Sequence, residues 1–218
     1  MKPLILINFK NYKESVGFSG VKLAKEMFLV KSKKYEIAIA PSIVLLKELS
    51  ELKQGKVFAQ YVDYHMHGAY TGSVLPAEVA EVGGYGTILN HSEKKIPFGV
   101  LQNIILECKR VGLKIVICAS SLAEVSLMVN LKPDYIAYEP AELIGGDISV
   151  TSVKKKVIAD AVKIVKKKGF QTKILCGAGV HSREDLVNAL KLGASGVLLA
   201  HGIVCAKEPK EKLRELLR

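Results

Sequence analysis

The sequence is poor in several residue types whose absence excludes some classes of protein. Its 218 residues include no tryptophan, and its four cysteines are scattered without a Cys-x-x-Cys pattern or a Cys/His spacing that suits zinc. We therefore expect reduced, buried thiols and no metal site. No apolar run approaches the roughly 20 residues that a membrane-spanning helix requires. The apolar run after Pro3 is too short for a signal peptide and ends at Asn8. We expect a cytoplasmic protein with no membrane partner.

Acidic residues are also scarce, since 21 of them face 32 lysines and arginines, for a net charge of +11. This charge favours acidic partners, either nucleic acid or a small phosphorylated substrate, and by itself does not choose between them. The densest basic runs, at residues 31–34, 154–156 and 166–168, fall in or at the ends of predicted helices and contain no interleaved aromatics. That pattern is more typical of solvated helix faces than of a nucleic-acid site.

Apolar runs with strand character alternate with helix-period segments along the whole chain. Strands are expected at residues 4–9, 36–40, 57–61, 86–90, 114–118, 134–138, 172–176 and 196–199. Helices are expected at residues 21–31, 43–52, 76–82, 101–111, 122–129, 153–168, 183–192 and 208–217. Most strands are apolar throughout, as in a parallel sheet that is buried on both faces.

Eight strands alternating with helices predict an α/β fold of the (β/α)₈ barrel type, with short helices, in one domain over residues 1–218. A doubly wound open sheet is the alternative, but no Gly-x-Gly-x-x-Gly follows the first strand. A barrel this short has trimmed helices and loops, which leaves apolar surface for a subunit partner to cover.

Polar residues follow the first predicted strand, at the end of a barrel where active sites lie. Asn8 and Lys10 would point to the same side of an extended chain and face the barrel mouth together. The Lys10 ammonium would then bind an anionic oxygen and balance negative charge in an enolate-like transition state. An ordinary solvent lysine at a strand end is an equally good interpretation of this residue taken alone.

A histidine, His91, follows the fourth predicted strand. Because it precedes a helical turn, the positive end of that turn would disfavour the imidazolium and keep the ring neutral. A neutral histidine polarises a carbonyl and moves a proton between adjacent oxygens. A lone histidine is more often structural, so this interpretation depends on its neighbours. Ser92 and Glu93 are expected to orient or cap other groups.

The sixth predicted strand ends in a carboxylate, Glu139, and Pro140 restricts that residue to extended or turn geometry. The glycine pair that follows a few residues later permits backbone angles closed to other residues. The pattern predicts a catalytic base beside a mobile lid. The lid would comprise Pro140, Ala141, Glu142, Leu143, Ile144, Gly145, Gly146 and Asp147.

The last two predicted strands end in glycine-bearing turns, at residues 176–180 and 200–203. In many barrels, backbone N–H groups and helix N-termini at these two turns converge on a phosphate, and glycine permits its close approach. Two ordinary tight turns are the alternative. We favour a phosphate site.

These motifs, taken in order, resemble the triosephosphate isomerase family over nearly the whole chain. The resemblance is carried by Asn8-Phe9-Lys10, Gly68-Ala69-Tyr70-Thr71-Gly72, His91-Ser92-Glu93, Tyr138-Glu139-Pro140, Leu143-Ile144-Gly145, Gly177-Ala178-Gly179 and Ala200-His201-Gly202. The short helices, the form of the lid, and Asn90 at a position where many members have glycine are similar to the compact archaeal branch.

The resemblance implies an isomerase that interconverts dihydroxyacetone phosphate and glyceraldehyde 3-phosphate without a metal or an organic cofactor. It implies Glu139, His91, Lys10 and Asn8 as catalytic residues, with Glu139 as the base. It implies that the substrate and its phosphate are bound by Asn8, Phe9, Lys10, Ile144, Gly145, Gly177, Gly179, Ala200 and His201. It also implies a homo-oligomer, a tetramer or a dimer, in which Thr71 reaches the site of a neighbouring subunit.

The chain departs from the family pattern at three residues. Gly146-Asp147 replaces the usual Thr-Gly of the lid, and His201 stands where serine is usual. A second lid glycine raises the entropy cost of closure. Another phosphosugar barrel enzyme is an alternative, although the one lysine available for a Schiff base, Lys114, lies at a strand start. A non-catalytic nucleic-acid-binding barrel is a third interpretation, which predicts steeply salt-dependent binding.

Overall fold

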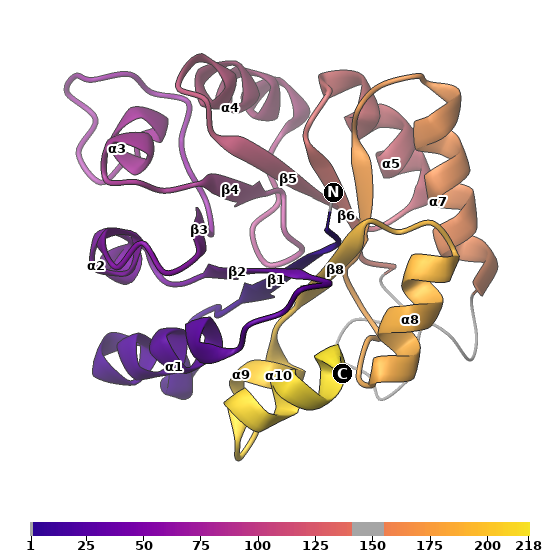
Figure 1. The fold of residues 1–218 in the computed structure, drawn as a ribbon. Coiled ribbons are helices and arrows are strands. Elements are labelled where there is room, and N and C mark those ends of the chain that lie inside the picture. Colours follow the sequence, from indigo (N-terminus) through magenta and orange to yellow (C-terminus); the bar gives the residue numbers. More distant parts are fainter. Residues whose placement is uncertain (1, 141–154) are drawn as a thin grey trace.

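The eight predicted strands form a closed parallel barrel in the order β1 to β8, and β8 pairs with β1 to complete it. The computed structural model describes residues 2–140 and 155–218. The strands are β1 Leu4–Asn8, β2 Glu36–Ala40, β3 Lys56–Ala59, β4 Gly86–Leu89, β5 Lys114–Ala119, β6 Tyr135–Tyr138, β7 Lys173–Cys176 and β8 Gly196–Leu199. Figure 1 shows the strands in the middle of the molecule with helices around them. The predicted (β/α)₈ fold is confirmed.

Helices follow the strands and cover the outside of the barrel. The α-helices described are α1 Gly17–Leu29, α2 Leu46–Glu51, α3 Pro76–Glu81, α4 Phe98–Arg110, α5 Leu122–Met128, α7 Lys155–Lys167, α8 Arg183–Lys191, α9 His201–Val204 and α10 Pro209–Leu217. Short 3₁₀ turns lie at η1 Lys13–Ser15, η2 Ile43–Leu45 and η3 Val129–Leu131. The helices α2, α3 and α5 have only six or seven residues, as expected for a chain of this length.

Several helix starts carry the predicted signals. Ser182 and Asp185 form a reciprocal capping box at α8, and Pro76 opens α3. Ser42 precedes η2 as expected, but its side chain makes no capping hydrogen bond. A tighter 3₁₀ turn therefore takes the place of the first turn of the predicted helix 43–52.

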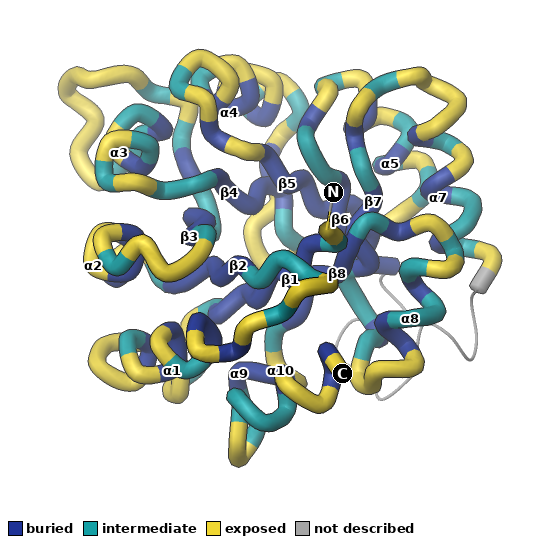
Figure 2. Tube along the Cα trace, viewed as in Figure 1, coloured by how far each residue is buried: buried dark blue, intermediate teal, exposed yellow. Residues whose placement is uncertain are grey.

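The interior of the barrel is filled by side chains. Alternate residues of each strand face the axis, and one buried apolar cluster inside the barrel includes Leu6, Phe58, Ile88, Val116 and Leu175. A larger cluster packs the outer faces of the strands beneath the helices. Figure 2 shows this arrangement as dark strands surrounded by helices whose outer faces are exposed. Because the middle of the barrel is solid, a binding site can form only at its two rims.

Candidate active site

A cavity of about 650 Å³ lies at the rim where the strands end. The predicted site residues that line it are Asn8, Lys10, His91, Glu139, Gly177, Gly179, Ala200 and His201. They come from five strand ends, so the barrel brings together groups that are up to 193 residues apart in the chain. Phe9 is placed elsewhere, since its side chain is fully buried in the outer core cluster. Of the predicted lid, Pro140 is described and residues 141–147 lie outside the described part of the chain.

Glu139 is a buried carboxylate that follows directly on β6. Its side chain is 7% exposed, and its Oε2 has no hydrogen-bond partner among the residues that the structure describes. Burial disfavours the charged form and raises the pKa of Glu139 to about 7, although the Lys10 ammonium and the Cys118 thiol act in the opposite direction. A carboxyl group with a pKa near neutrality can both accept and return a proton.

Gly177 provides the space that Glu139 occupies. A Cβ atom added at residue 177 would overlap Cγ of Glu139 and press on its carboxyl group. The N–H of Gly177 donates to the carbonyl of Tyr138, which continues the β6–β7 ladder. That N–H is therefore already used within the barrel, and the absence of a side chain at Gly177 leaves room for the Glu139 carboxylate. The role of Gly177 in phosphate binding stays a prediction.

His91 lies beside Glu139, with its Nε2 3.7 Å from Oε1 of the carboxylate. The backbone N–H of Glu93 donates to His91 Nδ1 over 3.2 Å, so the ring accepts at Nδ1 and carries its proton on Nε2. The pKa of His91 is lowered, chiefly by burial and further by Lys10 and Lys95, while Glu93 opposes the change. The ring is neutral, as expected, but desolvation is the main cause and not a helix terminus, because α4 begins only at Phe98.

Lys10 reaches the same cavity from the end of β1. Its Nζ forms a 2.6 Å ion pair with Glu93. Burial lowers the pKa of Lys10, and the contacts with Glu93 more than offset this, so the pKa is raised and the ammonium is retained. The backbone of Lys10 has a φ of +47°, which is uncommon for a residue with a side chain. Gln60 holds this strained segment by donating to the carbonyls of Lys10 and Ala40, each over 3.0 Å.

The predicted extended geometry from Asn8 to Lys10 is wrong, because β1 ends at Asn8 and the chain then turns. The two side chains converge on the cavity by another route. Asn8 Oδ1 accepts the backbone N–H of Lys10 over 2.9 Å, which closes the turn. Asn8 is 5% exposed, so its amide is fixed by packing as well.

Asn90 supports the segment that carries His91. It has a φ of +57°, a conformation that asparagine tolerates better than most residues. Its side chain donates to the carbonyl of Cys118 and accepts the N–H of Ile96, both over 3.0 Å. These two bonds tie the end of β4 to β5 and to the loop before α4, and they give a physical reason for asparagine at this site.

The two glycine-bearing turns border the other side of the cavity. Gly179 has a φ of +69°, which favours glycine. The N–H groups of Gly179, His201 and Gly202 have no backbone acceptor within the described chain. His201 is the first residue of α9, and its ring meets Tyr12 edge-on at 5.8 Å. Residues of both turns thus line the same cavity, and their N–H groups have no backbone acceptor in the described chain, which is consistent with the phosphate interpretation.

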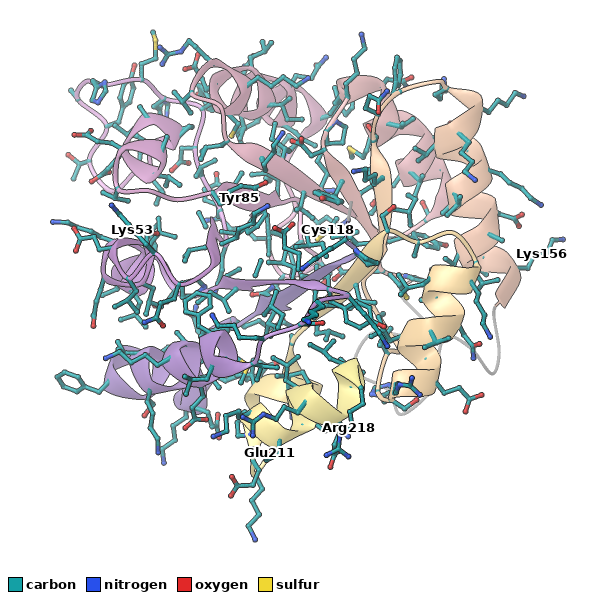
Figure 3. The ribbon with its side chains drawn as sticks, viewed as in Figure 1. Lys53, Tyr85, Cys118, Lys156, Glu211 and Arg218 are labelled. Atoms are coloured by element: carbon teal, nitrogen blue, oxygen red, sulfur yellow. The ribbon has the colours of Figure 1, made fainter. Side chains whose placement is uncertain are left out.

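Three residues near the site carried no clear signal in the sequence. Gln60, after β3, holds the Lys10 backbone; Cys118 lies beneath Glu139 in the barrel interior; and Lys212, from α10, lines the cavity. Figure 3 shows Cys118 toward the middle of the barrel. A polar residue after a strand could have indicated Gln60. Nothing in the local pattern relates Lys212 to strand ends that lie far from it in the chain.

Among the residues described, no group of three or more His, Cys, Asp or Glu side chains is arranged to hold a metal ion. No described helix has the length and apolar character needed to cross a membrane. Three cysteines are buried, while Cys205 is half-buried and lies 3.8 Å from Glu14, so the expectation of four buried thiols holds for three of them.

A barrel that is solid in its interior, with a cavity at the carboxyl ends of the strands that contains a carboxylate, an imidazole and an ammonium group, defines a (β/α)₈-barrel enzyme. The contact between a carboxylate of pKa about 7 and a neutral imidazole indicates proton-transfer chemistry. The fold is similar to that of a solved triosephosphate isomerase from Bartonella henselae, with a TM-score of 0.73, 18% identity and coverage of 92% of each chain.

Comparison of the sequence makes the assignment specific. A family model described as triosephosphate isomerase matches residues 3–216. A triosephosphate isomerase of Methanocaldococcus jannaschii is 39% identical over 99% of both chains. One of Methanothermus fervidus is 38% identical over 99% of this chain and 98% of its own length. The chain belongs to the triosephosphate isomerase family, and its reaction is the interconversion of dihydroxyacetone phosphate and glyceraldehyde 3-phosphate.

Proposed function

We propose that Glu139 is the base of this isomerisation. It removes a proton from the carbon next to the carbonyl of dihydroxyacetone phosphate and returns it to the neighbouring carbon. The observation that carries this assignment is its position: a buried carboxylate with a pKa of about 7 lies 3.7 Å from a neutral imidazole at the rim of the barrel. The raised pKa makes the carboxylate a stronger base than an exposed glutamate.

We assign the remaining catalytic roles by similarity to the family. His91, with its proton on Nε2, and the amide of Asn8 polarise the two substrate oxygens and move protons between them. Lys10 offsets the charge of the enediolate, and Glu93 holds its Nζ at the cavity wall over 2.6 Å. A neutral imidazole suits this role because its Nε2–H donates a hydrogen bond to a substrate oxygen. Its acidity is closer to that of the enediol than the acidity of an imidazolium would be.

We place the phosphate between the turns at Gly179 and at Ala200-His201. The support is their shared cavity and the N–H groups of Gly179, His201 and Gly202, which have no backbone acceptor in the described chain. Ile144 and Gly145 complete this proposal as lid residues that cover the substrate, together with the other residues of the 140–147 segment. Closure over the enediolate excludes water and protects it from phosphate elimination.

A coupled assay with glyceraldehyde 3-phosphate tests the assignment of the base. Glu139→Gln should lower kcat by at least about 10²-fold, because a positioned base contributes on that scale. Glu107→Gln is the matched control, since this glutamate makes a surface ion pair with Arg110 on α4. Retention of wild-type kcat by Glu139→Gln, with the same near-UV spectrum as the wild type, would remove Glu139 from the mechanism.

We propose that the protein is a homo-oligomer, with one contact formed by the loops after β1, β2 and β3. Large apolar side chains are exposed after each of the three strands: Phe18, at the start of α1, is 95% exposed, Val44, in η2, is 86% exposed, and Met66 and Tyr70, after β3, are also exposed. The start of α1 packs beside η2, so the first two of these side chains belong to one surface. Thr71 lies in the third loop, where it is exposed and would reach the site of a neighbour.

A second apolar area supports a tetramer in preference to a dimer. Leu106 on α4 is 64% exposed and Leu127 on α5 is 45% exposed. Light scattering after gel filtration separates the two contacts. Leu106→Glu with Leu127→Glu should convert a tetramer to a dimer, whereas Phe18→Glu with Val44→Glu should abolish the dimer unit. A monomeric wild type at 50 µM or about that concentration would contradict the proposal.

The same reasoning extends to domain organisation and location. We propose that residues 1–218 form one domain, because the described strands all belong to a single barrel.

A cytoplasmic location agrees with the free state of the four cysteines. Alkylation of all four thiols after unfolding, without reduction, would be expected for protein taken directly from cells.

A further inference from the structure

A second cavity, of about 830 Å³, lies at the opposite rim of the barrel, where the strands begin. Its walls come from the segments before β1, β4 and β6, from the first residues of several strands, and from the turns after α4 and α7. Lysine dominates this lining: Lys2, Lys56, Lys109, Lys114, Lys132 and Lys173. The mechanism of the isomerase uses none of them.

Three of these lysines occupy equivalent positions in the barrel. Lys56, Lys114 and Lys173 are the first residues of β3, β5 and β7. Each lies two residues before a side chain of the interior cluster, namely Phe58, Val116 and Leu175. Since alternate residues of a strand share a face, all three lysines are directed to the inner side of this rim. Side chains alternate in direction along each strand, so the inward-facing first positions of β3, β5 and β7 bring three ammonium groups to one rim. Apolar side chains could fill the same positions.

Two carboxylates neutralise part of this charge. Lys56 pairs with Glu36 over 2.7 Å and also donates to the hydroxyl of Tyr85 over 2.7 Å. Lys114 pairs with Asp134 over 2.8 Å. Glu36 and Asp134 are the carboxylates in the lining of the cavity as described, against six lysines. Figure 3 shows Tyr85 toward the middle of the barrel in that view.

The peripheral lysines make their described contacts with neutral groups. Lys109 Nζ donates to the carbonyl of Leu131 over 2.9 Å, and Lys2 Nζ to that of Ser32 over 3.2 Å. Lys132 Nζ lies 5.0 Å from the centre of the Phe170 ring. Carbonyl dipoles and aromatic faces fix the positions of these ammonium groups but leave their net charge in place.

A concave wall concentrates this charge. Lysines on a convex helix face diverge into solvent and are screened separately, whereas those around a cavity add their fields in one volume. The positive potential at this rim therefore exceeds what the overall charge of the chain provides at an average surface point. Ammonium groups act as point charges for phosphoryl oxygens, and several sources spaced around a cavity suit a ligand that carries several negative charges.

We propose that this cavity binds a small polyanion that carries two or more phosphate groups. A single phosphate would contact only a few of the lysines in a cavity of this size. Two or three linked phosphate groups would reach the lysines at the strand starts and the peripheral lysines together. The site is separate from the active site, because the solid barrel interior lies between the two rims.

Isothermal titration with inorganic triphosphate tests the proposal directly. The wild type should bind it with an affinity that falls as salt rises, and saturating dihydroxyacetone phosphate should leave this binding in place. Lys109→Glu with Lys132→Glu should weaken it at least about tenfold, since two of the positive charges that line the cavity are reversed. The matched control is Lys22→Glu with Lys25→Glu, which makes the same charge change at two exposed residues on α1.

Activity and folding are measured on the same samples. All three proteins should have the same kcat and KM, which shows that the cavity variant is folded and that its loss of binding does not arise at the active site. Equal weakening in the control and the cavity variant would overturn the proposal, and so would complete displacement of triphosphate by dihydroxyacetone phosphate. Tighter binding of a single-stranded oligonucleotide, lost in the same variant, would overturn the small-molecule assignment in favour of nucleic acid.

Discussion

Two carboxylates at opposite ends of β6 have opposite environments. Asp134, just before the strand, accepts from Lys114 Nζ over 2.8 Å and from the N–H of Ile115 over 3.0 Å. Glu139, just after the strand, is almost fully buried, and its Oε2 meets no hydrogen-bond partner within residues 2–140 and 155–218. One strand thus connects an ion-paired carboxylate with a buried carboxylate that we propose as the base.

The contrast shows how the barrel separates stability from catalysis. A buried charged group without an ionic partner lowers the stability of the folded state. Proteins retain such a group where their function depends on it. At the rim where the strands end, burial raises the pKa of Glu139 to about 7. At the rim where they begin, the carboxylates face lysines and hold neighbouring strands together. Substitutions of the same type at the two rims should therefore have different effects.

The largest difference is expected for two lysines with similar ion pairs. Lys10 pairs with Glu93 over 2.6 Å and Lys56 with Glu36 over 2.7 Å. Lys10→Gln should lower kcat/KM by about 10² to 10³-fold, because it removes the positive charge that stabilises the negatively charged enediolate. Lys56→Gln should leave kcat/KM within about twofold of the wild type. Steady-state kinetics in both directions measures this, and similar losses in the two variants would contradict the division between the rims.

The next effect concerns the space around the base. Gly177→Ala should lower kcat by about 10 to 10²-fold, because the new methyl group displaces the Glu139 side chain from its position beside His91. Gly99→Ala is the control, since a Cβ atom there meets nothing within 4 Å and the residue lies in α4. The KM for substrate should change less than kcat in Gly177→Ala. A change in KM alone would assign Gly177 to phosphate binding, as the sequence had suggested.

Stability should respond in opposite directions at the two ends of β6. The raised pKa of Glu139 means that the folded protein binds a proton more tightly than the unfolded chain does, so the free energy of unfolding falls as pH rises from about 4.5 to about 7. Glu139→Gln removes this penalty and should be more stable than the wild type by about 2 to 3 kcal/mol at pH 8 and by little at pH 4.

Asp134→Asn provides the comparison, because it weakens a partly exposed ion pair and should destabilise the protein by about 0.5 to 1 kcal/mol at pH 8. Urea denaturation of both variants at pH 4 and pH 8 measures the two effects. A Glu139→Gln protein less stable than the wild type at pH 8 would show that the carboxylate is satisfied in the folded state.

The smallest effect is expected from the thiol beneath the base. Cys118 lowers the pKa of Glu139, so Cys118→Ala should raise it further and move the acid limb of kcat/KM to higher pH. Activity at pH 6 should fall about twofold, since a thiol is a weak donor, and activity at pH 9 should be unchanged. Cys108→Ala, at a buried cysteine of α4, should leave the profile in place. An identical profile for both variants would exclude Cys118 from tuning the base.

Local pattern was sufficient for most of the fold. The strands β2 and β8 begin and end at the predicted residues, and the other six differ by one or two residues at an end, because near-continuous apolar runs leave few ways to bury both faces of a sheet. The short turns η1 and η2 were not predicted. They depend on contacts with neighbouring elements, which a one-dimensional pattern does not contain.

The residues at the strand ends were also accessible from the sequence, but their geometry was not. Asn8 and Lys10 were expected along one extended chain, yet Lys10 adopts a φ of +47° and is held by Gln60 from β3. The neutral state of His91 was expected from a helix terminus and arises mainly from burial. In each case the cause is packing against segments that lie far away in the chain.

The order of apolar runs, glycine turns and polar residues by itself determined that this chain forms a (β/α)₈ barrel and which residues follow its strands, because those features act over a few neighbouring positions. Packing of the strands against one another decided the rest. The pairing of β6 with β7 places Gly177 where it makes room for Glu139, the strand order brings His91 within 3.7 Å of that carboxylate, and the lysines that begin β3, β5 and β7 surround one cavity. The pKa values and the charge of each rim depend on distances between strands that are far apart in the chain, and packing in three dimensions sets those distances.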